Sequence, residues 1–379
     1  MILSDRSHVD LCAGAGGLAL GCAAAGFETV ALYERDSRSC ATLRHNVARG
    51  LLSGTVVEAD VSRIRWQQPS GTLSLLSAGL PCQPFSVAGA HKAIVDERNL
   101  FPELFRAIRC LRPLVVLVEN VPGLMRPRFK DYFEYILAQL SMPQSSPLRG
   151  EDWRRHFLRL TRELQAEDCE PDYFVQWRIL NSADFGVPQI RRRLFLVATS
   201  RELGAFSFPR QSHSRYPLDP GSSKPEGGGP FDWRSAQHAR SEEPKPWISV
   251  KEALEGLPEA TPHAASPVAN HFPIDGARSY PRHLPSVMHL PAKTVKAGVH
   301  GVAGGENTVS VAGGGVRYFT LRELARLQTF PDSYEFLGPR SSIVRQIGNA
   351  VCCALAEELA AGALALIEQH YSAGKRRAI

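Results

Sequence analysis

The chain has 379 residues, of which 44% are hydrophobic, and it carries a formal net charge of +6. This length suits a large domain with a smaller one beside it, and so mild a positive charge is only a weak indication of nucleic-acid binding. The sequence has no uninterrupted run of eighteen apolar residues and no signal-peptide pattern in "MILSDRSHVD", so we expect a cytoplasmic protein that does not cross a membrane.

The first two hundred residues alternate between strand-like and helix-like segments. Short apolar runs predict strands over 7–12, 28–36, 55–60, 73–79 and 113–120. Amphipathic spacing predicts helices over 36–48, with Asp36 or Ser37 as the N-cap, and over 99–111. Such a pattern is typical of an α/β fold with a doubly wound, mostly parallel sheet. Ligands of these sheets bind at the carboxyl ends of the strands.

The composition changes near residue 200, where Pro, Gly, Ser and His become frequent. This segment is too long for a linker inside a compact protein, so we expect a second, smaller, loop-rich domain. The expected division is a first domain over 1–199, the loop-rich domain over 200–336 and a returning C-terminal segment over 337–379. Residues 319–330 predict a helix that ends before Pro331, and 341–370 predict a loop followed by a long apolar helix. Residues 151–164 predict a surface helix with solvated arginines.

The stretch "DLCAGAGGLALG", residues 10–21, follows the first predicted strand. A glycine-rich turn at this place lets a cofactor approach the backbone closely. Glu34 ends the second predicted strand and is placed to bind ribose hydroxyls. Asp60 ends the third and could accept a hydrogen bond from an adenine amino group. The pattern alone does not separate a nicotinamide from an S-adenosylmethionine site, nor either of them from a glycine turn without a ligand.

Eight cysteines occur without a CxxC pair, so no metal site is expected. Cys82 differs from the others because it lies in "GLPCQPFS", at the end of the fourth predicted strand. A thiolate there would be a strong nucleophile, and residues 84–98 resemble a mobile lid. The alternative is a buried cysteine in a turn.

Two further motifs carry polar side chains. "VVLVENVPG" ends the fifth predicted strand with Glu119, whose pKa would rise if the crevice removes it from water, as acid catalysis requires. In "GVPQIRRRLFLVA", extended geometry places Gln189, Arg191 and Arg193 on one face, as donors for a phosphate or a carbonyl. The alternatives are a capping carboxylate and a basic edge strand.

The glycine turn, PCQ, ENV, QxRxR and a late "GNAV", in this order, closely resemble the bacterial-type DNA (cytosine-5)-methyltransferases. The resemblance covers the first two hundred and the last sixty residues. It implies a Rossmann-like methyltransferase fold with a target-recognition domain in the middle segment. It implies that the cofactor is S-adenosylmethionine, with S-adenosylhomocysteine as product. The cofactor-binding residues implied by this resemblance are Cys12, Ala13, Gly14, Ala15, Gly16, Gly17, Leu18, Glu34, Arg35, Asp60, Val61, Pro81, Leu100, Asn349 and Ala350.

The resemblance also implies the catalytic roles. Cys82 attacks C6 of cytosine, Glu119 holds N3, and Arg193 with Arg191 orients the base through O2. The implied partner is double-stranded DNA with the target base flipped out, bound by a monomer, and a cognate restriction endonuclease acting separately is a further candidate partner. Candidate DNA contacts are Gln83, Ser86, Lys92, Arg98, Gln189, Lys293, Thr294, Lys296, His300 and Asn307.

Two residues depart from the family pattern, since Cys12 replaces an aromatic residue and Arg35 replaces a large apolar one. Three alternatives stay open. The branch of this family that modifies transfer RNA lacks an extended recognition region, which this chain has. A nicotinamide oxidoreductase would leave PCQ, ENV and QxRxR unexplained. A DNA-binding relative without activity would not need Cys82 and Glu119.

Overall fold

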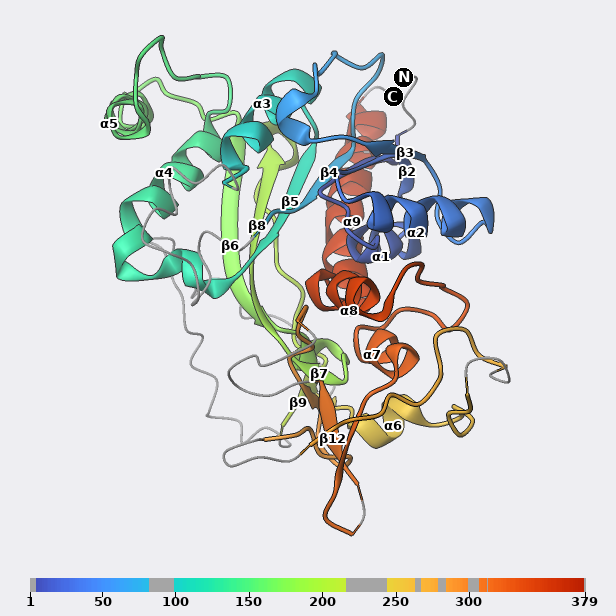
Figure 1. Ribbon diagram of the computed structural model, residues 1–379. Coiled ribbons are helices and arrows are strands. Elements are labelled where there is room, and N and C mark those ends of the chain that lie inside the picture. Colours follow the sequence, from blue (N-terminus) through green and yellow to red (C-terminus); the bar gives the residue numbers. More distant parts are fainter. Residues whose placement is uncertain are drawn as a thin grey trace.

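A seven-stranded sheet forms the centre of the molecule (Figure 1). The computed structural model describes residues 5–81, 99–215, 244–262, 267–278, 284–298, 307–311 and 313–377. The strand order is β3-β2-β1-β4-β5-β8-β6, with the first five strands of the chain paired in parallel and β8 antiparallel to both neighbours. These strands are β1 Ser7–Leu11, β2 Glu28–Glu34, β3 Thr55–Glu58, β4 Leu75–Gly79, β5 Val115–Asn120, β6 Tyr173–Asn181 and β8 Arg192–Ser200.

Helices cover both faces of the sheet, as the near-continuous apolar strands predict. Val116 and Val118 of β5 belong to one core cluster, whereas Val115 and Leu117 belong to another. The first cluster takes its helical residues from α3, α4 and α5, and the second from α1 and α9. The mostly parallel, doubly wound architecture is therefore confirmed. These helices are α1 Gly17–Ala24, α3 Phe101–Leu111, α4 Lys130–Ser141, α5 Trp153–Leu164 and α9 Cys353–Arg377.

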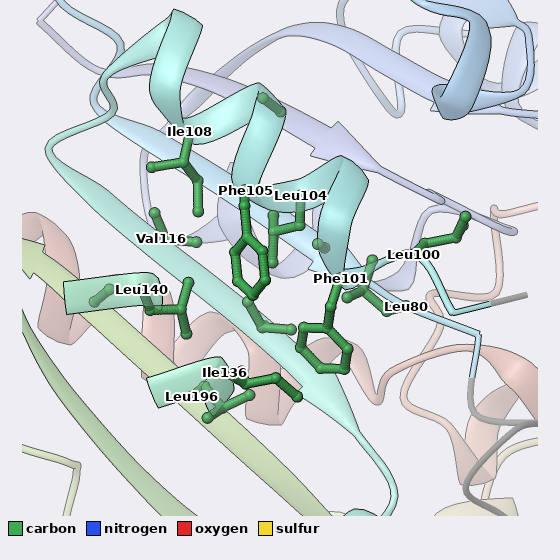
Figure 2. Packing of buried hydrophobic residues seen from close by; sticks show 14 of the residues in the cluster. Leu80, Leu100, Phe101, Leu104, Phe105, Ile108, Val116, Ile136, Leu140 and Leu196 are labelled. Atoms are coloured by element: carbon green, nitrogen blue, oxygen red, sulfur yellow. The ribbon is translucent and has the colours of Figure 1, made fainter. Parts of the chain in front are cut away.

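Helix α3 packs against one face of the central sheet. Figure 2 shows Phe101, Leu104 and Phe105 of this helix packed over the sheet beside Val116. Leu80 and Leu100 extend the same buried cluster on either side of the segment 82–98, which lies outside the described residues. The core therefore anchors the chain at both ends of that segment.

Local sequence signals place several elements correctly. Helix α2, Ser37–Ala48, begins after Asp36, whose carboxylate accepts a hydrogen bond from the Ser39 backbone N–H at 2.9 Å. Helix α7, Leu321–Leu327, ends before Pro331 and has a capping box formed by Thr320 and Glu323.

One expected element is wrong. Residues 341–349, expected as a loop, belong to helix α8, Arg340–Asn349, which precedes α9. Ile343, Val344 and Ile347 of this helix are buried, and their spacing of three and four residues matches one helical face. The final loop is only the short break between Asn349 and Cys353.

The part of the middle segment that the structure describes forms short elements below the sheet in Figure 1. Its strands pair in twos, β9 with β10, β11 with β7, and β12 with β13. The loop-rich character expected from composition is thus present in the described parts of this segment. The elements of this segment include β9 His213–Ser214, β10 Lys245–Pro246, α6 Val250–Leu254, β11 Ala292–Lys293, β12 Thr308–Ser310 and β13 Val316–Tyr318, whereas β7, Gln189–Ile190, precedes the segment in the chain.

The C-terminal segment returns to the first domain, where α9 packs along α1 (Figure 1). The stretch Arg340–Ser372 is long and apolar enough to cross a membrane, but 61% of its most apolar window is buried inside the fold. Small residues of α1 make this contact close, because a Cβ atom at Gly21 would lie 2.5 Å from Ala356 Cβ and 2.6 Å from Cys353 O. The apolar helix therefore belongs to the protein core.

We predict that Gly21→Val lowers the free energy of unfolding by about 1–3 kcal/mol, since overpacking forces α1 and α9 apart. Urea unfolding followed by circular dichroism measures this loss. Ala24→Val, at an exposed position of the same helix, is the matched control and should change little. Equal stability of the two variants would contradict the role given to this contact.

Candidate active site

A cavity of about 380 Å³ opens at the carboxyl ends of β1, β2, β4 and β5. Its wall includes every residue expected to bind the cofactor except Ala15 and Gly16. Glu119, Arg191 and Arg193 line the same cavity. Motifs that are far apart in the sequence thus meet in one place, because the parallel strands end at the same edge of the sheet.

The glycine turn forms one side of the cavity. Gly14 has φ +55° and Gly16 has φ +81°, a backbone conformation that glycine adopts without strain. A Cβ atom at Gly14 would meet nothing within 4 Å, so the backbone there borders open space. Ala15 is fully buried instead, and its carbonyl accepts a hydrogen bond from the Tyr334 hydroxyl at 2.7 Å. Ala15 and Gly16 therefore support the turn from behind.

Two acidic residues line the same cavity, and one of them binds this turn directly. The Glu34 carboxylate accepts hydrogen bonds from the backbone N–H groups of Gly14, Arg35 and Asp36, each at 2.8 Å. Only one of these bonds reaches Oε2, which keeps a lone pair for a ligand hydroxyl. Hydrogen bonds from Ser62 hold the pKa of Asp60 below its usual value, so this carboxylate stays an acceptor.

Arg35, one of the two departures from the family pattern, lies next to Asp60. Its guanidinium is 3.7 Å from the Asp60 carboxylate, and the two side chains are 58% and 32% exposed. An exposed pair of this kind contributes little to stability. Arg35 therefore places a half-exposed cation in the cavity lining, where its contact with Asp60 is weak.

Glu119 is 7% exposed at the end of β5, and its Oε1 lies 2.9 Å from Arg193 Nε. Burial raises the pKa of Glu119, and the Arg193 and Arg191 guanidinium groups oppose this rise without cancelling it. The site can therefore hold a proton on this carboxyl group at a higher pH than an exposed glutamate can.

Arg191 and Gln189 lie deeper than expected. Arg191 is 2% exposed and donates hydrogen bonds to the carbonyls of Val295, Gly348 and Ala350. Gln189 is fully buried and binds Leu327, Gln328 and Val295. The expectation that Gln189 contacts DNA is wrong, since its amide is enclosed by protein. Burial still alternates along the motif, because Ile190 and Arg192 are exposed.

The expected DNA contacts of the middle segment divide into two groups. Lys293 and Thr294 of the β11 region reach the surface, where they donate to the carbonyls of Leu284 and Ile190. Asn307 uses its amide on both backbone groups of Lys296, at 2.9 Å each, and so fixes the chain rather than facing outward. The remaining predicted residues, Cys82, Gln83, Ser86, Lys92, Arg98 and His300, lie outside the described residues.

The structure adds cavity residues that sequence reasoning missed. Tyr33 lines the wall and packs edge-on against Trp66, with ring centroids 5.0 Å apart. The position of Tyr33 next to Glu34, at the end of β2, is the sequence feature that could have indicated this place in the cavity wall. Arg345 and Gln346 reach the cavity from α8, a helix that the sequence did not predict.

Comparisons with known proteins agree on one family. The sequence model described as C-5 cytosine-specific DNA methylase matches residues 7–142 and 146–364. Type II methyltransferase M.NgoMIV of Neisseria gonorrhoeae is 30% identical over 344 residues, which are 91% of this chain and 92% of that protein. Type II methyltransferase M.NgoFVII of the same organism is 29% identical over 96% of this chain and 87% of its own.

Solved structures share the fold at low sequence identity. The S. pombe Dnmt2 methyltransferase superimposes with a TM-score of 0.56 at 17% identity. The Entamoeba histolytica methyltransferase EhMeth does so with a TM-score of 0.58 at 12% identity. Each comparison covers 96% of this chain and 99% of the other.

We predict that Arg193→Met raises the pKa of Glu119 further, because it removes the nearest cation from a buried carboxyl group. Carboxyl ¹³C NMR of ¹³C-glutamate-labelled protein, assigned with Glu119→Gln, measures the change. A carboxyl group with a raised folded-state pKa binds more protons when folded than when unfolded. The variant should therefore lose stability more steeply than the wild type as pH rises above the usual value of 4.5. Arg192→Met, at the exposed neighbour, is the control, and an unchanged Glu119 pKa would refute the assignment.

Proposed function

The chain belongs to the C-5 cytosine-specific DNA methylase family, and from this premise we propose that it transfers a methyl group from S-adenosylmethionine to C5 of a cytosine flipped out of duplex DNA. The single observation that carries the proposal is the shared cavity. Glu119 and Arg193 line the same space as the glycine turn, Glu34 and Asp60. A site for a nucleoside cofactor and a site for a polar ring therefore adjoin.

The residues of the cavity fit an adenosyl cofactor. The open backbone at Gly14 leaves room for close approach, and Glu34 Oε2 retains an acceptor position for a ribose hydroxyl. Asp60 stays ionised and can accept from an adenine amino group, and Leu100 contributes an apolar wall. When bound, the cofactor supplies an electrophilic methyl group.

The chemistry of cytosine explains why this set of residues is needed. C5 is a poor nucleophile until a thiolate adds to C6, which gives C5 the character of an enamine. We assign this attack to Cys82, which follows the cavity residue Pro81 in the sequence. As the Sγ–C6 bond forms, protonated Glu119 supplies a proton to N3, so that the ring does not become a bare anion. After methylation a base removes the C5 proton, the electrons of the Sγ–C6 bond return to sulfur as a thiolate, and the N3 proton returns to the Glu119 carboxylate.

Arg193 has two tasks in this proposal. Its Nε binds Glu119, and the remaining guanidinium N–H groups can donate to O2 of the base. Arg191 acts differently, because its guanidinium is used by three backbone carbonyls. We therefore assign the base contact to Arg193 and a supporting position to Arg191.

The substrate follows from the family and from the middle segment. C5 is inaccessible in stacked duplex DNA, so the base must flip, at an energetic cost of a few kcal/mol. Residues 200–336 are the proposed recognition region, with Lys293, Thr294 and Lys296 as candidate contacts. We propose that a monomer acts on DNA in the cytoplasm, with a separate restriction endonuclease as its functional counterpart, since the similar proteins are named Type II methyltransferases.

We predict that Cys82→Ser abolishes methyl transfer and that Glu119→Gln lowers its rate by about 10²–10⁴-fold with DNA binding retained. Transfer of labelled methyl groups to unmethylated duplex DNA and to transfer RNA measures the rate and the substrate. Duplexes of random sequence with 5-fluorocytosine in place of cytosine should form a denaturant-stable adduct with the wild type only. Turnover by Cys82→Ser, or a preference for transfer RNA, would refute the proposal.

We predict that Glu34→Ala weakens binding of S-adenosylhomocysteine by about 10- to 100-fold, the effect of losing a hydrogen bond to a charged group. Isothermal titration calorimetry measures the affinity. Glu58→Ala is the matched control, because Glu58 ends β3, pairs with Arg44 and does not line the cavity. Equal affinities of the two variants would exclude Glu34 from the cofactor site.

A further inference from the structure

A buried set of polar side chains joins the candidate recognition strand β11 to the turn that closes the cofactor cavity. We call it the junction, and it comprises Gln189, Arg191 and Gln328 together with the backbone of Val295 and of residues 347–350. Gln189 and Gln328 are fully buried and Arg191 is 2% exposed. These groups come from four separate parts of the chain, and the backbone of Gln189 also pairs with β11 through β7.

Gln189 binds Val295 at the end of the junction that lies next to β11. Its Oε1 accepts a hydrogen bond from the Val295 backbone N–H at 2.8 Å. Its Nε2 donates to Gln328 Oε1 and to Leu327 O, both at 3.0 Å. Because one amide oxygen accepts and the nitrogen donates, this side chain has a single orientation that satisfies all three contacts.

Gln328 carries the connection to the cavity. Its Nε2 donates to Ile347 O at 2.7 Å and to Ala350 O at 3.1 Å. Ala350 and the adjacent Asn349 line the cofactor cavity. Gln189 and Gln328 therefore form an unbroken hydrogen-bonded chain from Val295 to the cavity wall.

Arg191 and a close backbone contact run parallel to this chain. The Arg191 guanidinium donates to Val295 O at 3.2 Å and to Gly348 O at 2.9 Å. A Cβ atom at Gly348 would lie only 2.4 Å from Ala297 N. The turn and the recognition strand thus touch directly and are fastened on both sides.

We propose that Gln328 is a positioning residue that couples cofactor binding to the order of the recognition strand, residues 292–298. Buried hydrogen-bonded networks have few alternative arrangements, so restraining one end restrains the other. Coupling is reciprocal, and cofactor binding then raises DNA affinity by the same factor by which DNA raises cofactor affinity. This inference rests on the proposed function, because it needs the cofactor in the cavity.

Hydrogen–deuterium exchange tests the coupling without DNA and without turnover. S-adenosylhomocysteine is added to the wild-type protein, and exchange is followed in peptides covering 343–352 and 292–298. We expect both segments to slow, the recognition segment by about tenfold, a common size for coupled sites. Slowing of 343–352 alone would overturn the coupling. Slowing of neither would overturn it too, and calorimetry with the same ligand then shows whether the proposed cofactor site has failed as well.

Variants test the assignment to Gln328. In Gln328→Met, S-adenosylhomocysteine should still slow exchange in 343–352, but the slowing in 292–298 should be clearly smaller than in the wild type, with only the Arg191 and Gly348 contacts left to transmit it. Gln139→Met is the matched control, since Gln139 is equally buried and its Nε2 also binds two backbone carbonyls, those of Met142 and Ser145. Gln139→Met should keep the response of both segments. Both variants lose buried hydrogen bonds, so a difference between them cannot come from that loss alone.

A second variant keeps the test informative if Gln328→Met does not fold. Gln189→Met removes the bond to Val295 and leaves Gln328 with its two carbonyl acceptors. It should likewise weaken the response of 292–298 while 343–352 continues to respond. A response of 292–298 that stays at the wild-type size in both variants would overturn the role of Gln328.

Discussion

A carboxyl group removed from water and bound by the Arg193 guanidinium is the constraint on which the candidate site depends. Glu119 is held at the end of the central strand β5, and the cation beside it comes from the start of β8. The antiparallel register pairs Asn120 with Leu194 and Glu119 with Phe195, so Arg193, the second residue of β8, lies where β5 ends. A parallel strand would begin at the opposite edge of the sheet, far from Glu119. The one reversal in an otherwise parallel succession is therefore what brings the acid and its cation together.

The second constraint is the closeness of the backbones around the glycine turn. Cβ atoms at Gly17 and Gly348 would lie 2.3 Å from Val351 O and 2.4 Å from Ala297 N. These contacts let the C-terminal segment pass directly over the turn and complete the cavity wall with residues 345–351. A cavity built from both ends of the chain cannot form until the whole domain has folded. The cofactor site and the core packing of α9 on α1 are therefore parts of one arrangement.

The sequence allowed correct predictions of the elements that neighbouring residues determine. Apolar runs gave the first five strands and Asp36 gave the start of α2. Polar residues at strand ends gave Glu34, Asp60 and Glu119, whereas most of the other predicted cavity residues came from the resemblance to a family. Long-range hydrogen bonds leave no local pattern, so the sequence could not show that Gln189 faces Gln328 across 139 residues. Helix α8 was missed because its polar start and its glycine resemble a loop, and only its packing reveals the apolar face. Arg191 was placed on the correct face of its strand, but its burial against carbonyls from three residues could not be read from the alternation.

The junction also explains how a loop-rich segment can keep a fixed place beside a rigid sheet. The described strands of the middle segment are two or three residues long, and such short pairings contribute little by themselves. Gln189 and Arg191 bind both backbone groups of Val295, and Asn307 binds both backbone groups of Lys296. Side chains from other parts of the chain thus fix the backbone of two successive residues beside β11. The place of this segment beside the sheet therefore depends on buried side chains more than on its own short strand pairings.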